Sequence, residues 1–146
     1  MGTGGALWNA RDDLEDEFIL LWGDDYHPIQ YAPLINHHRQ TSSKLTMTVT
    51  TDHHDMNLQF SDGRLVHYTK DEDVPKQFNG YEAGTSVVKK SIVQEFGKGG
   101  KWSWEKTVYP TMSNNIHVHL DNTKFWDMGT PERLERLEEF FNKSRS

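Results

Sequence analysis

Two acidic positions in the sequence have neighbours that make them candidates for metal chemistry. Asp24 and Asp25 follow Gly23, which ends the apolar run at residues 17–22. In open parallel sheets, ligands gather outside the carboxyl ends of the strands. Asp127 follows two aromatic residues and precedes a capped helix. Two such carboxylates brought together suit Mg²⁺, which takes one or two carboxylates along with phosphate oxygens of a substrate. The alternative for Asp24 or Asp25 is that its side chain only caps the turn after the run.

Eight histidines raise a second metal hypothesis. On a strand, His117 and His119 would share one face and could chelate zinc, but no glutamate or third histidine at motif spacing completes the site. The pairs His37–His38 and His53–His54, and the single His67, follow no ligand pattern. We therefore expect solvated or hydrogen-bonded histidines, and a histidine-rich metal-binding protein remains an alternative.

The glycine runs do not complete a nucleotide-binding motif. The run at residues 2–5 lacks the third glycine of a dinucleotide fingerprint. The loop at residues 97–101 leads to Trp102, where a P-loop requires serine or threonine. The sequence thus contains no ordinary nucleotide motif.

Composition excludes several classes of function. The chain of 146 residues carries a net charge of −6, from 16 basic and 22 acidic residues, and no basic stripe, so we expect no binding to nucleic acid. It has no cysteine, which excludes disulfides, thiolate metal sites and a cysteine nucleophile. Its longest apolar run, Phe18–Trp22, is far shorter than a membrane span, and the start does not resemble a signal peptide. We expect a soluble, cytoplasmic protein with no membrane contact.

Periodicity predicts strands alternating with helices. The apolar run at residues 17–22 predicts a central strand buried on both faces. Before the last helix, Thr130 is a natural N-cap, and Leu134, Leu137 and Phe141 predict its buried stripe. The remaining segments predict helices at 4–14, 31–40, 91–96 and 103–108, strands at 44–51, 81–88 and 116–120, and a hairpin at 58–68. This order favours one α/β domain over residues 1–146, with a Rossmann-like, mostly parallel mixed sheet flanked by helices.

Five segments in this order resemble the sugar-1-phosphate nucleotidyltransferases. The most specific is Trp-Asp-Met-Gly-Thr-Pro-Glu-Arg-Leu at residues 126–134. The others are Gly-Thr-Gly-Gly-Ala-Leu at 2–7, Phe18–Asp24, Leu65–Lys70 and Glu-Ala-Gly-Thr-Ser at 82–86. The resemblance spans nearly the whole chain, and within the family it is closest to the bacterial type that activates hexose or heptose 1-phosphates.

The resemblance implies a reaction and a set of roles. Enzymes of this family transfer a nucleoside monophosphate from a nucleoside triphosphate to a sugar 1-phosphate, releasing pyrophosphate. Asp24 and Asp127 match the carboxylates that bind Mg²⁺, and Lys70 matches the lysine that meets the sugar phosphate; these three form the catalytic set. The matched binding positions are Gly2 and Thr3 for the nucleotide, and Glu82 and Gly84 for the sugar.

The family's N-terminal strand and its glycine-rich, triphosphate-binding loop have no counterpart in this sequence. The chain corresponds to the C-terminal portion of the family domain, and we expect it to be a poor catalyst by itself. The missing strands would flank residues 18–22, so we expect an open strand edge that seeks a second copy of the chain or a complementing N-terminal chain. The alternative function is a noncatalytic binding or assembly module that retains the fold.

Overall fold

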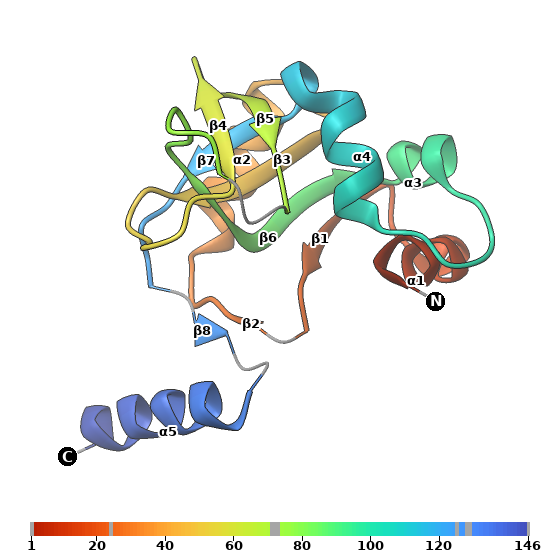
Figure 1. Cartoon of the computed structure of the whole chain (residues 1–146). Helices are drawn as coiled ribbons and strands as arrows, with labels where there is room; N and C mark the ends of the chain where they lie inside the picture. Colours follow the sequence, from red (N-terminus) through yellow and green to blue (C-terminus); the bar gives the residue numbers. More distant parts are fainter. Residues whose placement is uncertain (1, 24, 71–73, 125, 128–129, 146) are drawn as a thin grey trace.

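A six-stranded sheet with helices on both faces organises the chain (Figure 1). The computed structural model describes residues 2–23, 25–70, 74–124, 126–127 and 130–145. The strands are β1 (Glu17–Leu21), β2 (Asp25–Tyr26), β3 (Leu45–Thr50), β4 (Leu58–Ser61), β5 (Arg64–Tyr68), β6 (Tyr81–Lys89), β7 (His117–Leu120) and β8 (Trp126–Asp127). The helices are α1 (Gly2–Asn9), α2 (Tyr31–Gln40), α3 (Lys90–Phe96), α4 (Trp104–Met112) and α5 (Pro131–Arg145), with 3-10 turns at Arg11–Asp13 and Ser113–Asn115.

Strands β3 and β6 form the centre of the sheet, whose order is β1-β6-β3-β7-β5-β4. Successive side chains of a strand point to opposite faces. Val88 accordingly packs in the larger core with Trp104 and Tyr109 of α4, whereas Val87 packs with Leu34 of α2. All six residues of β3 are buried, because helices cover both faces of the sheet at this point.

The predicted α/β class and mixed sheet are confirmed, but the expectation of mostly parallel pairing is wrong. Among the described strands of the large sheet, β3 and β7 form the one parallel pair. The pairs β1–β6, β6–β3, β7–β5 and β5–β4 are antiparallel. Side-chain periodicity gives the burial of a strand and not its direction, so the alternation of strands and helices did not determine the pairing.

The apolar strand β1 lies at the edge of the sheet and not at its centre. In the described part of the chain it pairs with β6 alone, from Glu17 opposite Lys89 to Leu21 opposite Thr85. Its residues are half-buried, and Leu21 is 51% exposed. The prediction of a central strand was therefore wrong for this chain, whereas the prediction of an open edge at the same residues is confirmed.

Helix α5 packs on the small β2–β8 ribbon below the sheet (Figure 1). Thr130 is its N-cap, as predicted, since its Oγ1 accepts a hydrogen bond from the N–H of Arg133. Leu137 is buried, but Leu134 and Phe141 are 43% and 37% exposed. The predicted stripe is thus only partly covered, because two strands of two residues each cannot cover a helix of 15 residues. Among the described residues, no helix is long and apolar enough to cross a membrane.

Histidines line the contact between α2 and the sheet. His38 is buried, and its Nδ1 lies 2.8 Å from Oγ1 of Thr46 on β3. His37 Nδ1 lies 2.9 Å from Nδ1 of His119 on β7. Burial lowers the pKa of His38, His117 and His119, so the folded protein favours the neutral rings.

Helix α1 packs against the segment before α4 at a point where side chains would not fit. Gly2 has a φ of +74°, and a Cβ there would lie 2.5 Å from the carbonyl oxygen of Trp102. A Cβ on Gly4 would overlap the Trp102 ring, and the Gly4 N–H donates to that carbonyl oxygen at 3.0 Å. This close contact determines where Thr3 lies.

We predict that the free energy of unfolding falls as the pH is lowered below about 6.5, the ordinary histidine value. Above that pH the rings are neutral in both states; below it, the unfolded chain takes up protons that the buried rings of the folded chain resist. Urea unfolding at pH 7.5 and pH 5.5 measures the effect. The His38→Gln variant should lose part of the pH dependence, and an unchanged dependence would contradict the assignment.

We further predict that Gly4→Ala destabilises the fold by about 1–3 kcal/mol, because the methyl group overpacks the contact with Trp102. Gly99→Ala is the matched control, since a Cβ there has no atom within 4 Å. The control should change stability by less than about 0.5 kcal/mol. Urea unfolding compares the two variants, and equal stability would show that α1 does not depend on this contact.

Candidate functional site

A buried carboxylate, that of Glu105 at the start of α4, gathers polar side chains from three segments. Its Oε2 accepts hydrogen bonds from Ser103 Oγ at 2.7 Å, Lys70 Nζ at 3.1 Å and Thr3 Oγ1 at 3.2 Å. Glu105 is 5% exposed. The predicted residues Thr3 and Lys70, which are far apart in the sequence, thus meet on one atom.

The electrostatics of this group keep the Glu105 carboxylate charged. Burial alone would raise its pKa, but the hydrogen bonds from Ser103 and the backbone, together with the charge of Lys70, lower it below the usual value. Lys70 is 42% exposed, so its ammonium group joins a buried anion to the surface. The pair is the place where an external anion could compete for a positioned lysine.

The capping of α4 positions the Glu105 group. Ser103 is the N-cap of α4, and its Oγ accepts from the N–H of Lys106 at 3.3 Å. Glu105 therefore lies in the first turn, where the helix dipole favours a negative charge. Thr3 Oγ1 also accepts from the N–H of Trp104 at 2.9 Å, which fixes α1 to the same helix end.

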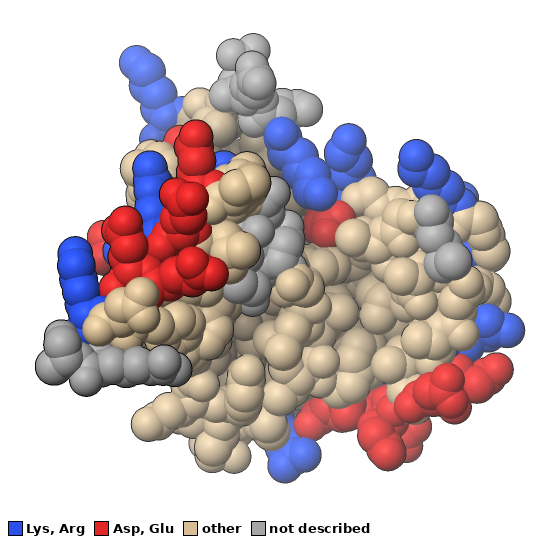
Figure 2. All heavy atoms as spheres, turned by 90° about the horizontal axis from the view of Figure 1, so that it is seen from below, with Lys and Arg blue, Asp and Glu red and all other residues tan. Residues whose placement is uncertain are grey.

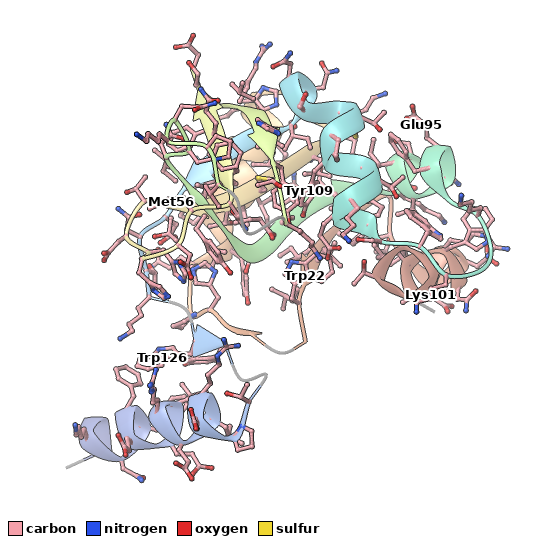
Figure 3. All side chains as sticks on the ribbon, in the orientation of Figure 1. Trp22, Met56, Glu95, Lys101, Tyr109 and Trp126 are labelled. Carbon is pink, nitrogen blue, oxygen red and sulfur yellow. The ribbon has the colours of Figure 1, made fainter. Side chains whose placement is uncertain are left out.

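A second carboxylate, Glu82 on β6, lies on the other side of two buried tyrosines. Its Oε1 accepts from Trp22 Nε1 at 3.2 Å and from the hydroxyl of Tyr109 at 3.5 Å. The rings of Tyr68 and Tyr109 meet edge to face, with centroids 4.9 Å apart. Figure 3 shows Tyr109 on α4 above Trp22, which stands at the end of β1. The predicted sugar-site residue Glu82 thus faces Trp22 and α4.

The two tyrosines between the carboxylates are held neutral. Burial is the main cause that raises the pKa of Tyr68 and Tyr109, and the charges of Glu82 and Glu105 raise both further. Neutral phenols remain hydrogen-bond donors. The core between the two carboxylates can therefore orient polar groups but does not itself take part in proton transfer near neutral pH.

Gly84 lies in an irregular part of β6. Its φ is +84°, and the pairing with β3 shifts between Met47 and Val49. Only glycine adopts this conformation readily. The carbonyl oxygen of Gly84 accepts from the N–H of Trp22 at 3.1 Å, so the irregularity fixes the end of β1 beside Glu82.

The acidic segments meet in the β2–β8 ribbon, whose backbone register places Asp25 opposite Asp127 and Tyr26 opposite Trp126. Asp24 lies outside the described residues. For Asp127, the structure gives the backbone pairing with Asp25. The ribbon therefore pairs the backbone of Asp25 with that of Asp127, and the assignment of Asp24 and Asp127 to a metal stays a prediction.

His27 anchors this ribbon to the sheet. It is 7% exposed, with Nδ1 at 3.2 Å from Thr85 Oγ1 and Nε2 at 3.2 Å from the carbonyl oxygen of Thr123. Burial lowers its pKa, although the hydrogen bond to Thr123 opposes this. A neutral ring that donates from Nε2 and accepts at Nδ1 satisfies both partners.

The structure places four of the seven predicted site residues in two separate pairs. Thr3 and Lys70 meet at Glu105; Glu82 and Gly84 meet at Trp22. Sequence reasoning missed Trp22 and Glu105, together with the tyrosine pair at positions 68 and 109. An acidic residue just after a capping serine was a visible signal for Glu105, but nothing in the sequence paired it with Lys70.

The sequence matches no family model and no curated protein. Solved structures match it over nearly its full length. HddC from Yersinia pseudotuberculosis is 24% identical, with a TM-score of 0.76 over 96% of this chain and 62% of that chain. An inositol-1-phosphate CTP transferase from T. maritima is 16% identical, with a TM-score of 0.73 over 97% and 62%. A putative glucose-1-phosphate thymidylyltransferase from Bacillus anthracis, in complex with sucrose, is 10% identical, with a TM-score of 0.74 over 95% and 60%.

The chain thus spans 60–62% of the length of these structures. HddC has also been solved in complex with GMP-PN, and this chain matches that structure with a TM-score of 0.78. The fold resemblance that the sequence predicted is confirmed. The chain shares the fold of these structures, two of which are named as a putative glucose-1-phosphate thymidylyltransferase and an inositol-1-phosphate CTP transferase.

Proposed function

We propose that the chain is one domain, residues 1–146, that provides the sugar-phosphate and metal half-site of a nucleotidyltransferase. In the proposed reaction, an oxygen of the sugar 1-phosphate attacks the α-phosphorus of a nucleoside triphosphate. A new bond forms from phosphorus to that oxygen, the bond to the bridging oxygen breaks, and pyrophosphate leaves with the electron pair. Such a protein would draw its triphosphate from the cytoplasm, which is where we place it.

The meeting of Thr3 and Lys70 at Glu105 carries this proposal. Both residues match family positions in the sequence resemblance. The two residues lie 67 positions apart in the sequence, and the fold brings both side chains to the same carboxylate oxygen. The structural match over 96% of the chain supports the same assignment.

Lys70 would bind the phosphate of the sugar 1-phosphate. An ammonium group has three donors, so one can remain on Glu105 while another reaches a phosphate oxygen. The bond to Glu105 limits the freedom of the side chain before substrate arrives, which lowers the entropy cost of positioning it. Glu82 and Gly84 would line the sugar pocket, and Gly2 and Thr3 would approach the nucleotide.

Asp24 and Asp127 would hold Mg²⁺. The donor set fits the ion, because carboxylates are its preferred protein ligands. The register that places Asp25 opposite Asp127 also brings the two acidic segments together. When bound, Mg²⁺ supplies charge neutralisation for the phosphates. The chain's own residues orient the acceptor phosphate, through Lys70, and anchor the ribbon, through His27.

The alternative is a noncatalytic binding or assembly module. The observation that favours it is that Thr3 and Lys70 already have hydrogen-bond partners within the chain, so both contribute to holding α1 and β5 on α4. Under this alternative the buried polar group is structural, and ligands would not alter it.

A partner strand on β1 is part of the proposal. The strand pairs only with β6 in the described residues, and Leu21 is exposed. The lower face, where β1, β2 and α5 lie in Figure 1, shows a broad area without Lys, Arg, Asp or Glu between two acidic groups (Figure 2). We propose that a second copy of the chain, or a chain carrying the nucleotide-binding part, covers this edge.

Calorimetric titration tests the half-site. We expect the chain to bind hexose 1-phosphates and nucleoside triphosphates only when Mg²⁺ is present. Asp24→Asn and Asp127→Asn should abolish the Mg²⁺-dependent binding. Lys70→Gln should weaken the binding of sugar 1-phosphate at least about tenfold, which corresponds to roughly 1.4 kcal/mol for a lost charged hydrogen bond.

Matched controls separate the ligand contacts from general effects of charge. Lys106→Gln removes an exposed cation one residue from Glu105, and Asp62→Asn removes a carboxylate from the β4–β5 turn. Both should bind as the unchanged chain does. Thermal unfolding verifies that each variant is folded. If the folded chain binds no sugar phosphate and no nucleoside triphosphate, the result would favour the noncatalytic module.

Sedimentation velocity tests the strand edge. We expect association that increases with concentration, and Leu21→Lys should reduce it because a charge on an edge strand opposes pairing. Val66→Lys, at a 40% exposed position on β5, is the control and should leave association unchanged. A monomer at every concentration would exclude self-association and leave a complementing chain as the partner.

A further inference from the structure

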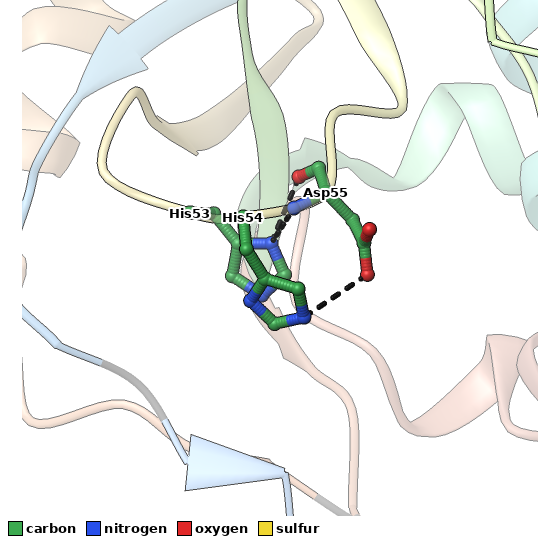
Figure 4. Close-up of side chains that lie close together, drawn as sticks. All are labelled: His53, His54 and Asp55. Carbon is green, nitrogen blue, oxygen red and sulfur yellow. Dashed lines mark hydrogen bonds and ion pairs between the residues drawn. The ribbon is translucent and has the colours of Figure 1, made fainter.

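Among the described residues, one group of histidine and carboxylate side chains is compact enough to hold a metal ion. It consists of His53, His54 and Asp55, which follow β3 and each offer one ligand atom, all within 4.8 Å of one another (Figure 4). His53 is half-buried, whereas His54 and Asp55 are exposed. The sequence pattern did not single out this group, because three consecutive residues match no known ligand spacing.

The surroundings of His53 resemble those of a metal ligand. Its Nδ1 lies 2.8 Å from the carbonyl oxygen of Asp55. Histidines that bind metal through one nitrogen almost always donate the other N–H to a carbonyl or carboxylate. The backbone N–H of Asp55 lies 3.0 Å from the same Nδ1. In the tautomer whose Nδ1 carries no proton, that nitrogen can therefore accept from Asp55. A metal at Nε2 would select the tautomer that donates to the carbonyl oxygen.

Stacking fixes the ring of His53. Its centroid lies 3.9 Å from that of Tyr81, at an interplanar angle of 11°. The ring of His54 stacks on that of His53, with centroids 4.5 Å apart and an interplanar angle of 21°. The stack on Tyr81 limits the rotation of the His53 ring, so this ligand loses less freedom on binding an ion than a free side chain would.

The carboxylate of Asp55 already lies beside the ring of His54. His54 Nε2 lies 3.1 Å from Oδ2 of Asp55. Two ligands of one zinc ion, each at about 2.0–2.2 Å, lie roughly 3–4 Å apart, so an ion can replace this contact with little movement. Two imidazoles and a carboxylate suit a divalent transition metal better than Mg²⁺, which prefers oxygen ligands alone.

All three residues line a cavity of about 590 Å³ between the β3–β4 loop and the start of α5. Its wall also carries Lys124, Arg133 and Arg136, against the carboxylates of Asp52 and Asp55. A divalent cation alone would meet an excess of positive charge there. An anion that joins the metal to these cations would balance the charge.

We propose that His53, His54 and Asp55 bind a divalent transition-metal ion, such as Zn²⁺, and that an oxyanion in the adjoining cavity completes its coordination. The site is independent of the proposed nucleotidyltransferase function, because its ligands are none of the residues assigned to that reaction. Metal binding here is also measured without sugar phosphate or triphosphate.

Titration with Co²⁺ tests the site, since this ion gives visible absorption bands when histidine ligands bind it. We expect one Co²⁺ bound per chain, in protein prepared without a histidine tag, and loss of the bands when Zn²⁺ displaces it. His54→Gln and Asp55→Asn should each weaken binding at least about tenfold. His53→Phe, which keeps an aromatic ring on Tyr81 and removes both nitrogens, should do the same.

His119→Gln is the control, because it disrupts the other close histidine pair, in which Nδ1 of His37 and His119 are 2.9 Å apart. It should leave Co²⁺ binding unchanged. Thermal unfolding shows whether each variant folds. His54 and Asp55 are exposed, so we expect their substitution to leave the fold intact. Absence of Co²⁺ binding to the folded chain, full binding by His54→Gln and Asp55→Asn, or loss of binding in His119→Gln alone would overturn the proposal.

Addition of inorganic phosphate to the Co²⁺-loaded chain tests the second ligand. The visible bands should shift, and the phosphate concentration required should increase in Arg136→Gln. Bands that phosphate does not change would overturn the oxyanion part of the proposal.

Discussion

The candidate site depends on keeping one buried carboxylate, that of Glu105, charged inside the protein. Removing a carboxylate from water costs several kcal/mol, which only close hydrogen bonds and an opposite charge can offset. Here Ser103, Thr3 and Lys70 supply them, and they come from three separate segments. The requirement to satisfy Glu105 therefore joins helix α1, the end of β5 and the start of α4 more firmly than apolar contact alone would.

The same requirement extends across the core to β1. Tyr68 and Tyr109 lie between Glu105 and Glu82, and the two negative charges help to keep both phenols neutral. Glu82 in turn accepts from the indole of Trp22, at the end of β1. The two carboxylates thus act on the same pair of buried tyrosines, one from the side of Lys70 and the other from the end of β1.

The sequence allowed most elements to be predicted, because their signals are local. The Asp62–Gly63 turn, the cap at Thr130 and the period of α2 depend on neighbouring residues alone. The direction and order of strands are set by contacts distant in the chain, which is why β1 was expected at the centre. Thr3 and Lys70 were found only through the resemblance, and Glu105 was missed because its partners lie 35 and 102 residues away.

Under the proposed function, the outer edge of β1 bears on how firmly the acidic ribbon is held. In the described part of the chain, β1 is paired on one side, by five residue pairs with β6 and by the hydrogen bond from the Trp22 N–H to the Gly84 carbonyl oxygen. A segment fixed on one side cannot hold an acidic group as firmly as a central strand does, and phosphate chemistry depends on firm positioning of charge. A strand added to this edge would bury Leu21 and fix the chain that follows it. Association at β1 and chemistry at the ribbon are therefore expected to be coupled.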